Sequence, residues 1–331
     1  MQLPNSPISP SPISPSPVSG APRDPRRVAN DLFDAVGSAV RGAPDTVRLA
    51  LVALLSGGHL LVEGMPGTGK TLLAKSLAVA LGGRYGRVQC TPDLLPADVT
   101  GTSVYSPATG EWDFRAGPIF ANVLLIDEVN RASPRTQAAL LEPMEERQVT
   151  VDGVTHLLPD PFFLVATQNP FGSAGTFPLP ESQLDRFALV CSLGLPGRAA
   201  EREILDGTGG VDALDALTHV TVPAELSATI AAVREVHCAH NVRDYVLDVA
   251  DATRNHPAIV LGASPRASLG LLRAAQAHAT VMGRDFVSPD DVKSVAPAAL
   301  AHRITMAHGV DVRAGWIVVG EIVGAVASPL P

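Results

Sequence analysis

Long apolar runs are missing from this sequence of 331 residues. A membrane-spanning helix needs ~18 uninterrupted apolar residues, whereas the nearest candidate, residues 315–320, is followed at once by Glu321. The N-terminus also lacks a basic stretch followed by an apolar one, which is the pattern of a secretory signal. We therefore expect no membrane insertion and no such signal.

Positive charge is in short supply, because 25 lysines and arginines stand against 33 aspartates and glutamates, for a formal net charge of -8. Proteins that bind nucleic acid regardless of its sequence neutralise phosphates with an excess of lysine and arginine. We expect no nucleic-acid partner on this ground. A local basic stripe within the acidic total is left open.

Cysteine is scarce, and Cys90, Cys191 and Cys238 lie far apart and outside any Cys-x-x-Cys pattern. This disfavours both a disulfide framework and a zinc site, and it fits reduced thiols in a cytoplasmic protein. His237 and His240 flank Cys238, but no full set of metal ligands accompanies them.

Composition divides the chain into three regions. Residues 1–25 are rich in serine and proline and are expected to form a disordered tail, with a docking role as the alternative. In residues 26–195, runs that fit buried strands alternate with stretches that fit helices, which indicates an α/β fold with a parallel sheet covered on both faces. The strands are expected at residues 60–62, 87–90, 123–126, 162–167 and 188–192.

Residues 196–331 have few strand signals and are expected to form a small helical domain. Apolar residues at helical spacing predict helices at residues 224–240, 245–255, 266–282, 290–304 and about 314–326. The fourth has Ser288 as an N-cap followed by Pro289 in its first turn. Pro297 is expected to kink or divide that helix.

The most informative stretch fits the phosphate-loop pattern Gly-x-x-x-x-Gly-Lys-Thr. Its residues are Gly64, Met65, Pro66, Gly67, Thr68, Gly69, Lys70 and Thr71. The loop lies between an expected strand and an expected helix, so its backbone N–H groups and the helix N-terminus can surround an anion. Lys70 would reach the β- and γ-phosphates and the Thr71 hydroxyl would hold Mg²⁺. The stretch predicts a nucleoside triphosphate site.

Polar residues follow two of the expected strands. Asp127 and Glu128 end the apolar run at 123–126, where open α/β sheets bind ligands. Asp127 would hold Mg²⁺ through water, and Glu128 would orient and deprotonate the attacking water. Asn169 follows the strand at 162–167 and would hold the water or the γ-phosphate, although an Asx turn before a proline is the alternative.

Two arginines are candidates for stabilising charge on the transferred phosphoryl group. Arg186 precedes the last expected strand and is a candidate arginine finger. The alternative for Arg186 is a solvated cation beside a helix C-terminus. Arg266 follows Ser264-Pro265 at a helix start, where a cation opposes the helix dipole, so an anionic partner is expected. Bound nucleotide is the predicted partner.

The order of these motifs resembles that of the MoxR family of AAA+ ATPases. The resemblance covers residues 39–304 approximately and rests on the phosphate loop together with TPDLLPADVTG at 91–101, FRAGPIF at 114–120, DEVNRA at 127–132, QNP at 168–170, GTFPLPE at 175–181 and LDRF at 184–187. The chain departs from the family in having Gly42-Ala43 where Gly-Gln is common, Cys90 at an aromatic position, and Pro143 within an expected helix over residues 137–146.

The resemblance implies an αβα ATPase core, a helical lid, ATP and Mg²⁺ as cofactors, and a homo-oligomeric ring that is often a hexamer. It implies that Asn169 is the sensor-one residue, that Arg186 is a finger acting on a neighbour's nucleotide, and that Arg266 is the sensor-two arginine of the lid. A chaperone-like role is expected, with a client protein or a von Willebrand factor A domain protein as partner.

Two hairpins are expected as insertions, at residues 103–114 and at 148–157, where Asp152-Gly153 suits a two-residue turn. The resemblance places both near the ring pore. Tyr105, Trp112 and Phe114 would then contact a client, or they would pack within the hairpin.

Three other functions stay open at this point: a nucleic-acid motor of the same AAA+ branch, a chelatase-type subunit that inserts a metal into a cofactor, and a nucleotide-switched scaffold with little turnover. Stimulation of hydrolysis by DNA, a metal-insertion assay with a partner and steady-state phosphate release, respectively, would separate them from the chaperone-like ATPase.

Overall fold

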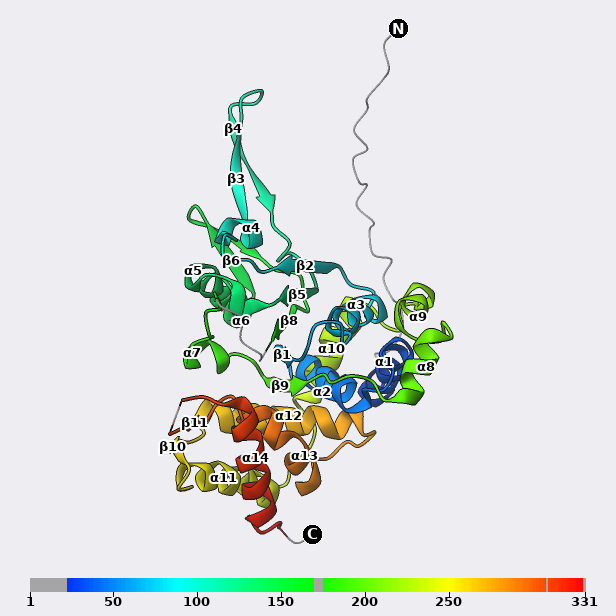
Figure 1. Ribbon diagram of the computed structural model, residues 1–331, viewed down its shortest axis with the longest axis vertical. Coiled ribbons are helices and arrows are strands. Elements are labelled where there is room, and N and C mark those ends of the chain that lie inside the picture. The colour runs from blue at the N-terminus through cyan, green and yellow to red at the C-terminus, as the bar shows by residue number, and fades with distance from the viewer. Residues whose placement is uncertain (1–22, 170–174, 308, 330–331) are drawn as a thin grey trace.

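The computed structural model describes residues 23–169, 175–307 and 309–329, so the expected tail lies almost entirely outside the described residues. Figure 1 shows the central sheet between a pair of projecting hairpins and a group of C-terminal helices. The strands are β1 (Leu60–Glu63), β2 (Tyr85–Gln89), β3 (Gly101–Ser106), β4 (Glu111–Ala116), β5 (Val123–Asp127), β6 (Gln148–Val151), β7 (Val154–Leu157), β8 (Phe163–Gln168), β9 (Leu189–Ser192), β10 (Ile259–Leu261) and β11 (Thr305–Met306). The helices are α1 (Pro25–Ala39), α2 (Pro44–Leu55), α3 (Lys70–Ala80), α4 (Pro96–Thr100), the 3₁₀ turn η1 (Val129–Arg131), α5 (Pro134–Ala138), α6 (Leu141–Glu146), α7 (Glu181–Leu184), α8 (Arg198–Leu205), α9 (Gly210–Ala216), α10 (Pro223–Val233), α11 (His240–Arg254), α12 (Pro265–Val281), α13 (Pro289–Leu300) and α14 (Val312–Ala325).

The five strands expected from the sequence form one parallel sheet in the order β2-β5-β8-β1-β9. Neighbouring residues of a strand pack into different cores. Leu60 and Val62 of β1 join the cluster that contains α1, α2 and α3, whereas Leu61 joins the cluster on the other face. Because both faces are covered, the strands are largely apolar, except for the edge strand β2, which carries the exposed Arg87 and Gln89. The predicted α/β fold is confirmed, with strand ends shifted by at most two residues.

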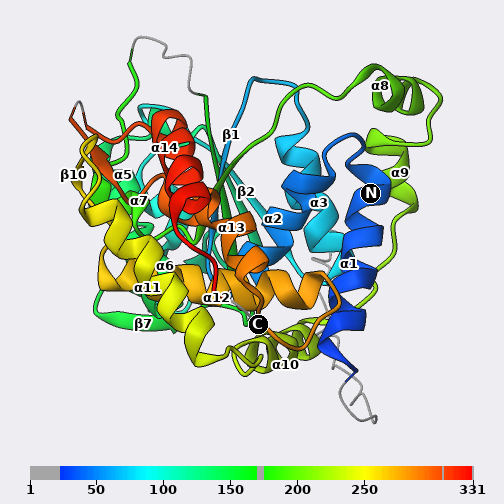
Figure 2. The same ribbon diagram turned by 90° about the horizontal axis from the view of Figure 1, so that it is seen from below.

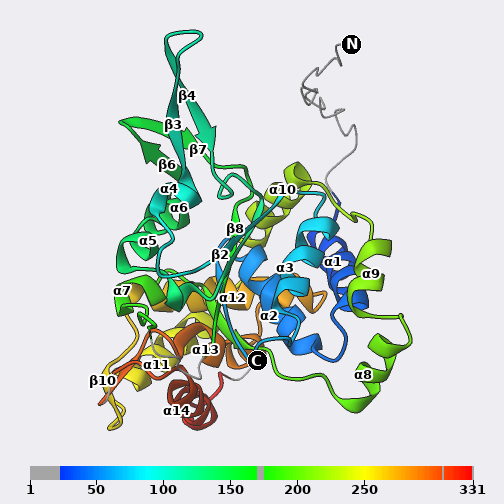
Figure 3. The same cartoon turned by 45° about the horizontal axis from the view of Figure 1, so that its top comes forward.

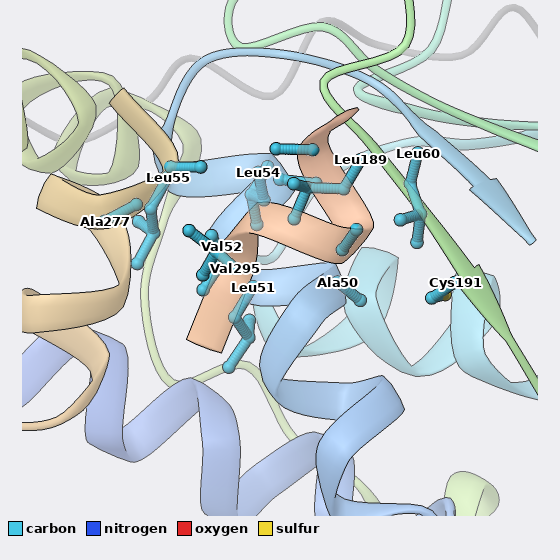
Figure 4. Packing of buried hydrophobic residues seen from close by; sticks show 14 of the residues in the cluster. Ala50, Leu51, Val52, Leu54, Leu55, Leu60, Leu189, Cys191, Ala277 and Val295 are labelled. Atoms are coloured by element: carbon cyan, nitrogen blue, oxygen red, sulfur yellow. The ribbon is translucent and has the colours of Figure 1, made fainter. Parts of the chain in front are cut away.

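Helix α2 connects the sheet to the C-terminal helices through apolar contacts. It lies against β9 on one side and α12 on the other, and its residues Leu51 and Leu55 are fully buried. Figure 4 shows side chains of α2 in the same cluster as Ala277 of α12 and Val295 of α13. The region that contains the glycine-rich loop at residues 64–71 and the helical C-terminal region therefore share one continuous core.

The helical C-terminal region is confirmed, but three of its expected boundaries are wrong, one of them the end of the helix expected at 290–304, which lies at Leu300. The helix expected at 224–240 ends at Val233, and the next helix begins at His240 rather than near residue 245. Between them His237 forms a bridge with Phe286, and its carbonyl accepts a hydrogen bond from Val287 N–H. This pairing with a distant segment replaces the helical hydrogen bonds. Figure 2 shows α11, α12, α13 and α14 gathered beside α2.

Prolines act differently in two helices. Pro297 lies inside α13, which continues without division, because α13 packs against both α12 and α14 and one lost backbone hydrogen bond is tolerated. The helix expected over 137–146 is instead two helices, α5 and α6, and Pro143 lies in the first turn of α6. A proline is accepted there because the first turn has no intrahelical partner for its N–H.

Both expected hairpins are present and lie side by side, as Figure 3 shows. Asp152 and Gly153 have positive φ values of 51° and 80°, which the tight turn between β6 and β7 requires. Phe114 of β4 stacks on His156 of β7 with ring centroids 3.9 Å apart. Tyr105 and Trp112 are a cross-strand pair and stay exposed.

The division of the chain at residue 195 stays a prediction: α9 contacts α1 and α3, and α10 contacts α1 and α2 as well as α12. All three cysteines are free and buried, and burial raises the pKa of Cys90 and Cys191 to about 12. Among the described helices, none combines the length and the apolar character needed to cross a membrane.

Candidate nucleotide-binding site

The glycine-rich loop connects β1 to α3 and encloses the N-terminus of that helix. Helix α3 begins at Lys70, and Gly69 before it has a φ of 100°, which side chains other than glycine's rarely allow. A Cβ on Gly64 would lie 2.5 Å from the carbonyl oxygen of Leu193. The loop conformation therefore depends on these glycines, and it leaves the first N–H groups of α3 available to an anion.

A crevice of about 560 Å³ opens beside this loop. It brings together predicted residues from the ends of three neighbouring strands, since β8 lies between β1 and β5. The predicted residues in its lining are Pro66, Gly67, Thr68, Gly69, Lys70, Thr71, Asp127, Glu128 and Asn169. Pro170, which completes the QNP motif, lies outside the described residues.

Lys70 is held by the loop itself. Its Nζ donates hydrogen bonds to the carbonyl oxygens of Gly64, at 2.6 Å, and Met65, at 2.8 Å. Burial lowers the pKa of Lys70, while the charges of Asp127 and Glu128 oppose that shift. A phosphate in the loop would offer the ammonium group charged oxygens in exchange for neutral carbonyls, which is the stronger hydrogen bond.

Asp127 has both carboxylate oxygens engaged by its own chain. Oδ1 accepts a hydrogen bond from the Thr167 hydroxyl at 2.6 Å, and Oδ2 accepts one from Nη2 of Arg87 at 2.9 Å. Thr167 is fully buried at the end of β8, whereas the side chain of Arg87 is largely exposed. Neither contact was predicted from the sequence, although Thr167 ends one of the expected strands.

Glu128 occupies a strained backbone position next to Asp127. Its φ and ψ are 56° and 51°, the left-handed region that non-glycine residues rarely adopt. Its N–H donates to the Thr167 hydroxyl at 2.9 Å, so one threonine holds both acids in place. The Glu128 carboxylate accepts a hydrogen bond from Arg131 at 3.0 Å. The strain is the kind found at functional sites.

The donor set of the crevice fits Mg²⁺. Thr71 supplies a hydroxyl and Asp127 a carboxylate, and both line the crevice. Mg²⁺ prefers such hard oxygen ligands and commonly uses one or two carboxylates together with substrate phosphates. No group of three or more His, Cys, Asp or Glu among residues 23–169, 175–307 and 309–329 could hold a metal ion by itself.

One wall of the crevice comes from helices α8 and α9, which the sequence did not indicate as part of the site. Ile204 of α8 and Val211 and Leu214 of α9 line it, opposite Val40. These apolar side chains suit the flat face of a nucleotide base. Their role was not visible in the sequence, because α8 and α9 follow the last strand and were assigned to the helical domain.

Arg186 and Arg266 do not line this crevice. They meet instead at Glu145 at the C-terminal end of α6, which forms an ion pair with Arg186 at 3.2 Å and with Arg266 at 2.9 Å. Asp185 lies 3.5 Å from Arg266 and 3.2 Å from the buried Arg303. We call these five residues the arginine cluster. The anionic partners of Arg266 in its own chain are thus two carboxylates, and its predicted contact with nucleotide stays a prediction.

Comparison with known proteins agrees with this site. Residues 59–189 match the model of the ATPase family associated with various cellular activities, and residues 251–314 match the AAA lid domain. Chaperone MoxR1 of Mycobacterium tuberculosis is 42% identical over 87% of this chain and 79% of its own length. Protein MoxR of Paracoccus denitrificans is 32% identical over 91% of this chain and 96% of its own length.

A solved structure of a candidate ATPase from Cytophaga hutchinsonii superimposes with a TM-score of 0.82, at 33% identity over 92% of this chain and 96% of that one. The parallel sheet, the phosphate loop and the lid therefore define a nucleotide-binding AAA+ ATPase. Within that class, the chain belongs to the MoxR family, as the motifs predicted.

Proposed function

We propose that this MoxR-family ATPase works as a ring, hexameric as is common in the family, in which the crevice of each chain is completed by Arg186 and Arg266 of its neighbour. One observation carries the proposal. Both arginines lie in a cluster away from the crevice of their own chain, although their charge is of the kind that phosphoryl transfer needs. A finger supplied by a second chain resolves that separation.

Within one chain, the crevice residues have complementary roles. The loop N–H groups and Lys70 would hold the phosphates, with Thr71 and Asp127 holding Mg²⁺, which neutralises phosphate charge. Glu128 would take the proton of the attacking water once Arg131 releases its carboxylate. Asn169 would align that water. Arg186 of the neighbour would stabilise charge that develops on the γ-phosphoryl group.

The output we propose is remodelling or maturation of a partner protein in the cytoplasm, with a von Willebrand factor A domain protein as the partner. The relatives support a chaperone role in outline, since one is named Chaperone MoxR1. A direct test is binding of a purified von Willebrand factor A domain protein to the Glu128→Gln form with ATP and with ADP. Binding that requires ATP supports the proposal, and binding to neither form contradicts it.

Complementation between two inactive variants tests the shared site. Arg186→Ala should lose turnover by roughly 10³-fold or more, and Lys70→Ala should lose phosphate binding. When the two are mixed, chains with an intact Lys70 would receive Arg186 from a Lys70→Ala neighbour, so phosphate release should partly return. If Arg186 acts within its own chain, mixing restores nothing. Arg135→Ala, at an exposed arginine of α5 outside both sites, is the control.

A further inference from the structure

Glu145 forms ion pairs with both arginines of the proposed neighbour-facing pair. Its Oε2 lies 3.2 Å from Nη2 of Arg186, and its Oε1 accepts a hydrogen bond at 2.9 Å from Nη1 of Arg266. The three residues come from separate parts of the chain: α6, the segment after α7, and the first turn of α12. The carboxylate of Glu145 therefore links Arg186 of the core to Arg266 of the lid.

The other two residues of the arginine cluster, Arg303 and Asp185, also connect the lid to the segment that carries Arg186. Arg303 is almost fully buried and donates hydrogen bonds to the carbonyl oxygens of Asp185, at 3.1 Å, and Phe187, at 2.9 Å. Oδ2 of Asp185 lies 3.5 Å from Nε of Arg266. The segment that carries Arg186 is thereby tied to the lid through its backbone as well as through its side chains.

Charge explains why a carboxylate is needed at this point. The cluster holds three arginines and two acids, and two like charges a few ångströms apart repel each other unless an opposite charge lies between them. Without Glu145, Arg186 and Arg266 would separate. Attraction keeps the carboxylate charged: partial burial works against its ionisation, but the hydrogen bond from Arg266 and the charge of Arg186 lower the pKa of Glu145.

Each guanidinium keeps hydrogen-bonding capacity for a further anion. An arginine has five N–H donors, and Glu145 uses one nitrogen of each. Arg186 Nη1 donates to the carbonyl of Ser182 and Nη2 to Glu145, so each of these nitrogens keeps a second N–H for a further anion.

We propose that Glu145 is a positioning residue that holds Arg186 and Arg266 together, so that both are presented to the same phosphate group of a neighbouring chain. This inference rests on the proposed function, because it needs the two arginines to act across an interface. Fixed geometry before the phosphate arrives avoids reorganisation during the reaction. Glu145 does not line the crevice of its own chain, so it should affect turnover without affecting nucleotide binding there.

The test compares three variants of the full chain: Glu145→Gln, Glu145→Asp and the control Glu146→Gln. Glu146 is the next residue and contacts Gln148 rather than an arginine. Steady-state phosphate release gives kcat and KM, binding of a labelled ATP analogue with Mg²⁺ gives nucleotide affinity, and sedimentation and thermal unfolding report assembly and stability. Glu145→Gln should lower kcat by about 10- to 100-fold, as expected for a misplaced catalytic group, with nucleotide affinity and assembly unchanged.

Two further results would separate positioning from a structural role. Glu145→Asp keeps the charge and should recover part of the kcat. In an Arg186→Ala, Arg266→Ala background, Glu145→Gln should cause no further loss, because nothing is left to position. An unchanged kcat, an equal loss in Glu146→Gln, or a kcat loss accompanied by lost assembly or nucleotide affinity would overturn the inference.

The outcomes also distinguish this inference from the proposed function. If Arg186→Ala retains full turnover, the shared site itself is wrong, whatever Glu145 does. If Arg186→Ala loses turnover and is complemented by Lys70→Ala, but Glu145→Gln turns over normally, the shared site stands and only the positioning role of Glu145 is rejected.

Discussion

The nucleotide crevice and the arginine cluster have opposite charge arrangements. In the crevice, the functional groups are acids and arginines hold them, with Arg87 on Asp127 and Arg131 on Glu128. In the cluster, the functional groups are arginines and the acid Glu145 holds them. Each set of functional groups therefore has counter-charges within its own chain. In the proposed ring, Mg²⁺ and water would replace Arg87 and Arg131 as partners of the acids, whereas Glu145 would stay with Arg186 and Arg266 as they meet the phosphate of the neighbouring crevice.

The largest expected effect comes from removing a charge on the crevice side. Glu128→Gln should reduce hydrolysis by about 10²- to 10⁴-fold, the range for loss of a general base, while ATP stays bound because the phosphate loop is intact. Single-turnover hydrolysis and retention of labelled ATP after gel filtration measure the two effects. Glu146→Gln is the matched control, since that acid lies in neither half. Normal hydrolysis by Glu128→Gln would show that Glu128 is not the general base.

A smaller effect is expected when an arginine on the crevice side is removed. Arg87→Gln frees Oδ2 of Asp127, so the Mg²⁺ concentration needed for tight binding of an ATP analogue should fall. The ion pair is exposed, and such pairs contribute about 0.2–1 kcal/mol, so the midpoint should shift by up to about fivefold. Titration of Mg²⁺ against analogue fluorescence measures it, with Arg84→Gln as the control. A midpoint that rises would show that Arg87 helps Asp127 to bind the metal.

The last effect concerns stability rather than catalysis, as acid sensitivity on the cluster side. His302 lies behind the cluster, where its Nε2 is 2.9 Å from the Phe187 carbonyl oxygen, and burial together with the charge of Arg303 lowers its pKa to about 3. Between that value and about 6.5, where an unfolded histidine titrates, the unfolded chain binds more protons, so stability is lost as pH falls. No histidine lines the described crevice.

His302→Asn should therefore flatten the dependence of the unfolding free energy on pH between about 4 and 6. The slope should decrease by up to about 1.4 kcal/mol per pH unit, which corresponds to one proton. Denaturant unfolding at several pH values measures the slope, and the exposed His240→Asn is the control. His59, whose pKa burial lowers to about 4, leaves part of the slope in place.

The crevice was predictable from the sequence to a greater degree than the cluster. The glycine loop and the acids each follow an apolar strand, and the carboxyl ends of parallel strands share one edge, so local patterns were enough to bring Lys70, Asp127 and Asn169 together. Glu145 and Arg266 are 121 residues apart and lie on different helices. No local pattern indicates such a contact.

The same distinction applies to the secondary structure: local patterns predicted the strands, whereas contact with a distant segment decided where one helix ends. Four of the five sheet strands are largely continuous apolar runs, and all five were predicted to within two residues at each end. The helix expected at 224–240 was too long, because the bridge from His237 to Phe286 depends on a segment about fifty residues further along and overrides helical periodicity. Helices α8 and α9 were not predicted as separate elements, although their apolar residues line the crevice.

The buried junction of α2 with α12 and α13 limits how far the lid can move relative to the ATPase core. Swinging the lid away from the ATPase core would expose Leu51, Leu55 and their partners to water, at about 25 cal/mol for each Å² of apolar surface. That cost favours keeping the core and the lid together as one unit. In the proposed ring, movement is then expected between neighbouring chains rather than within one.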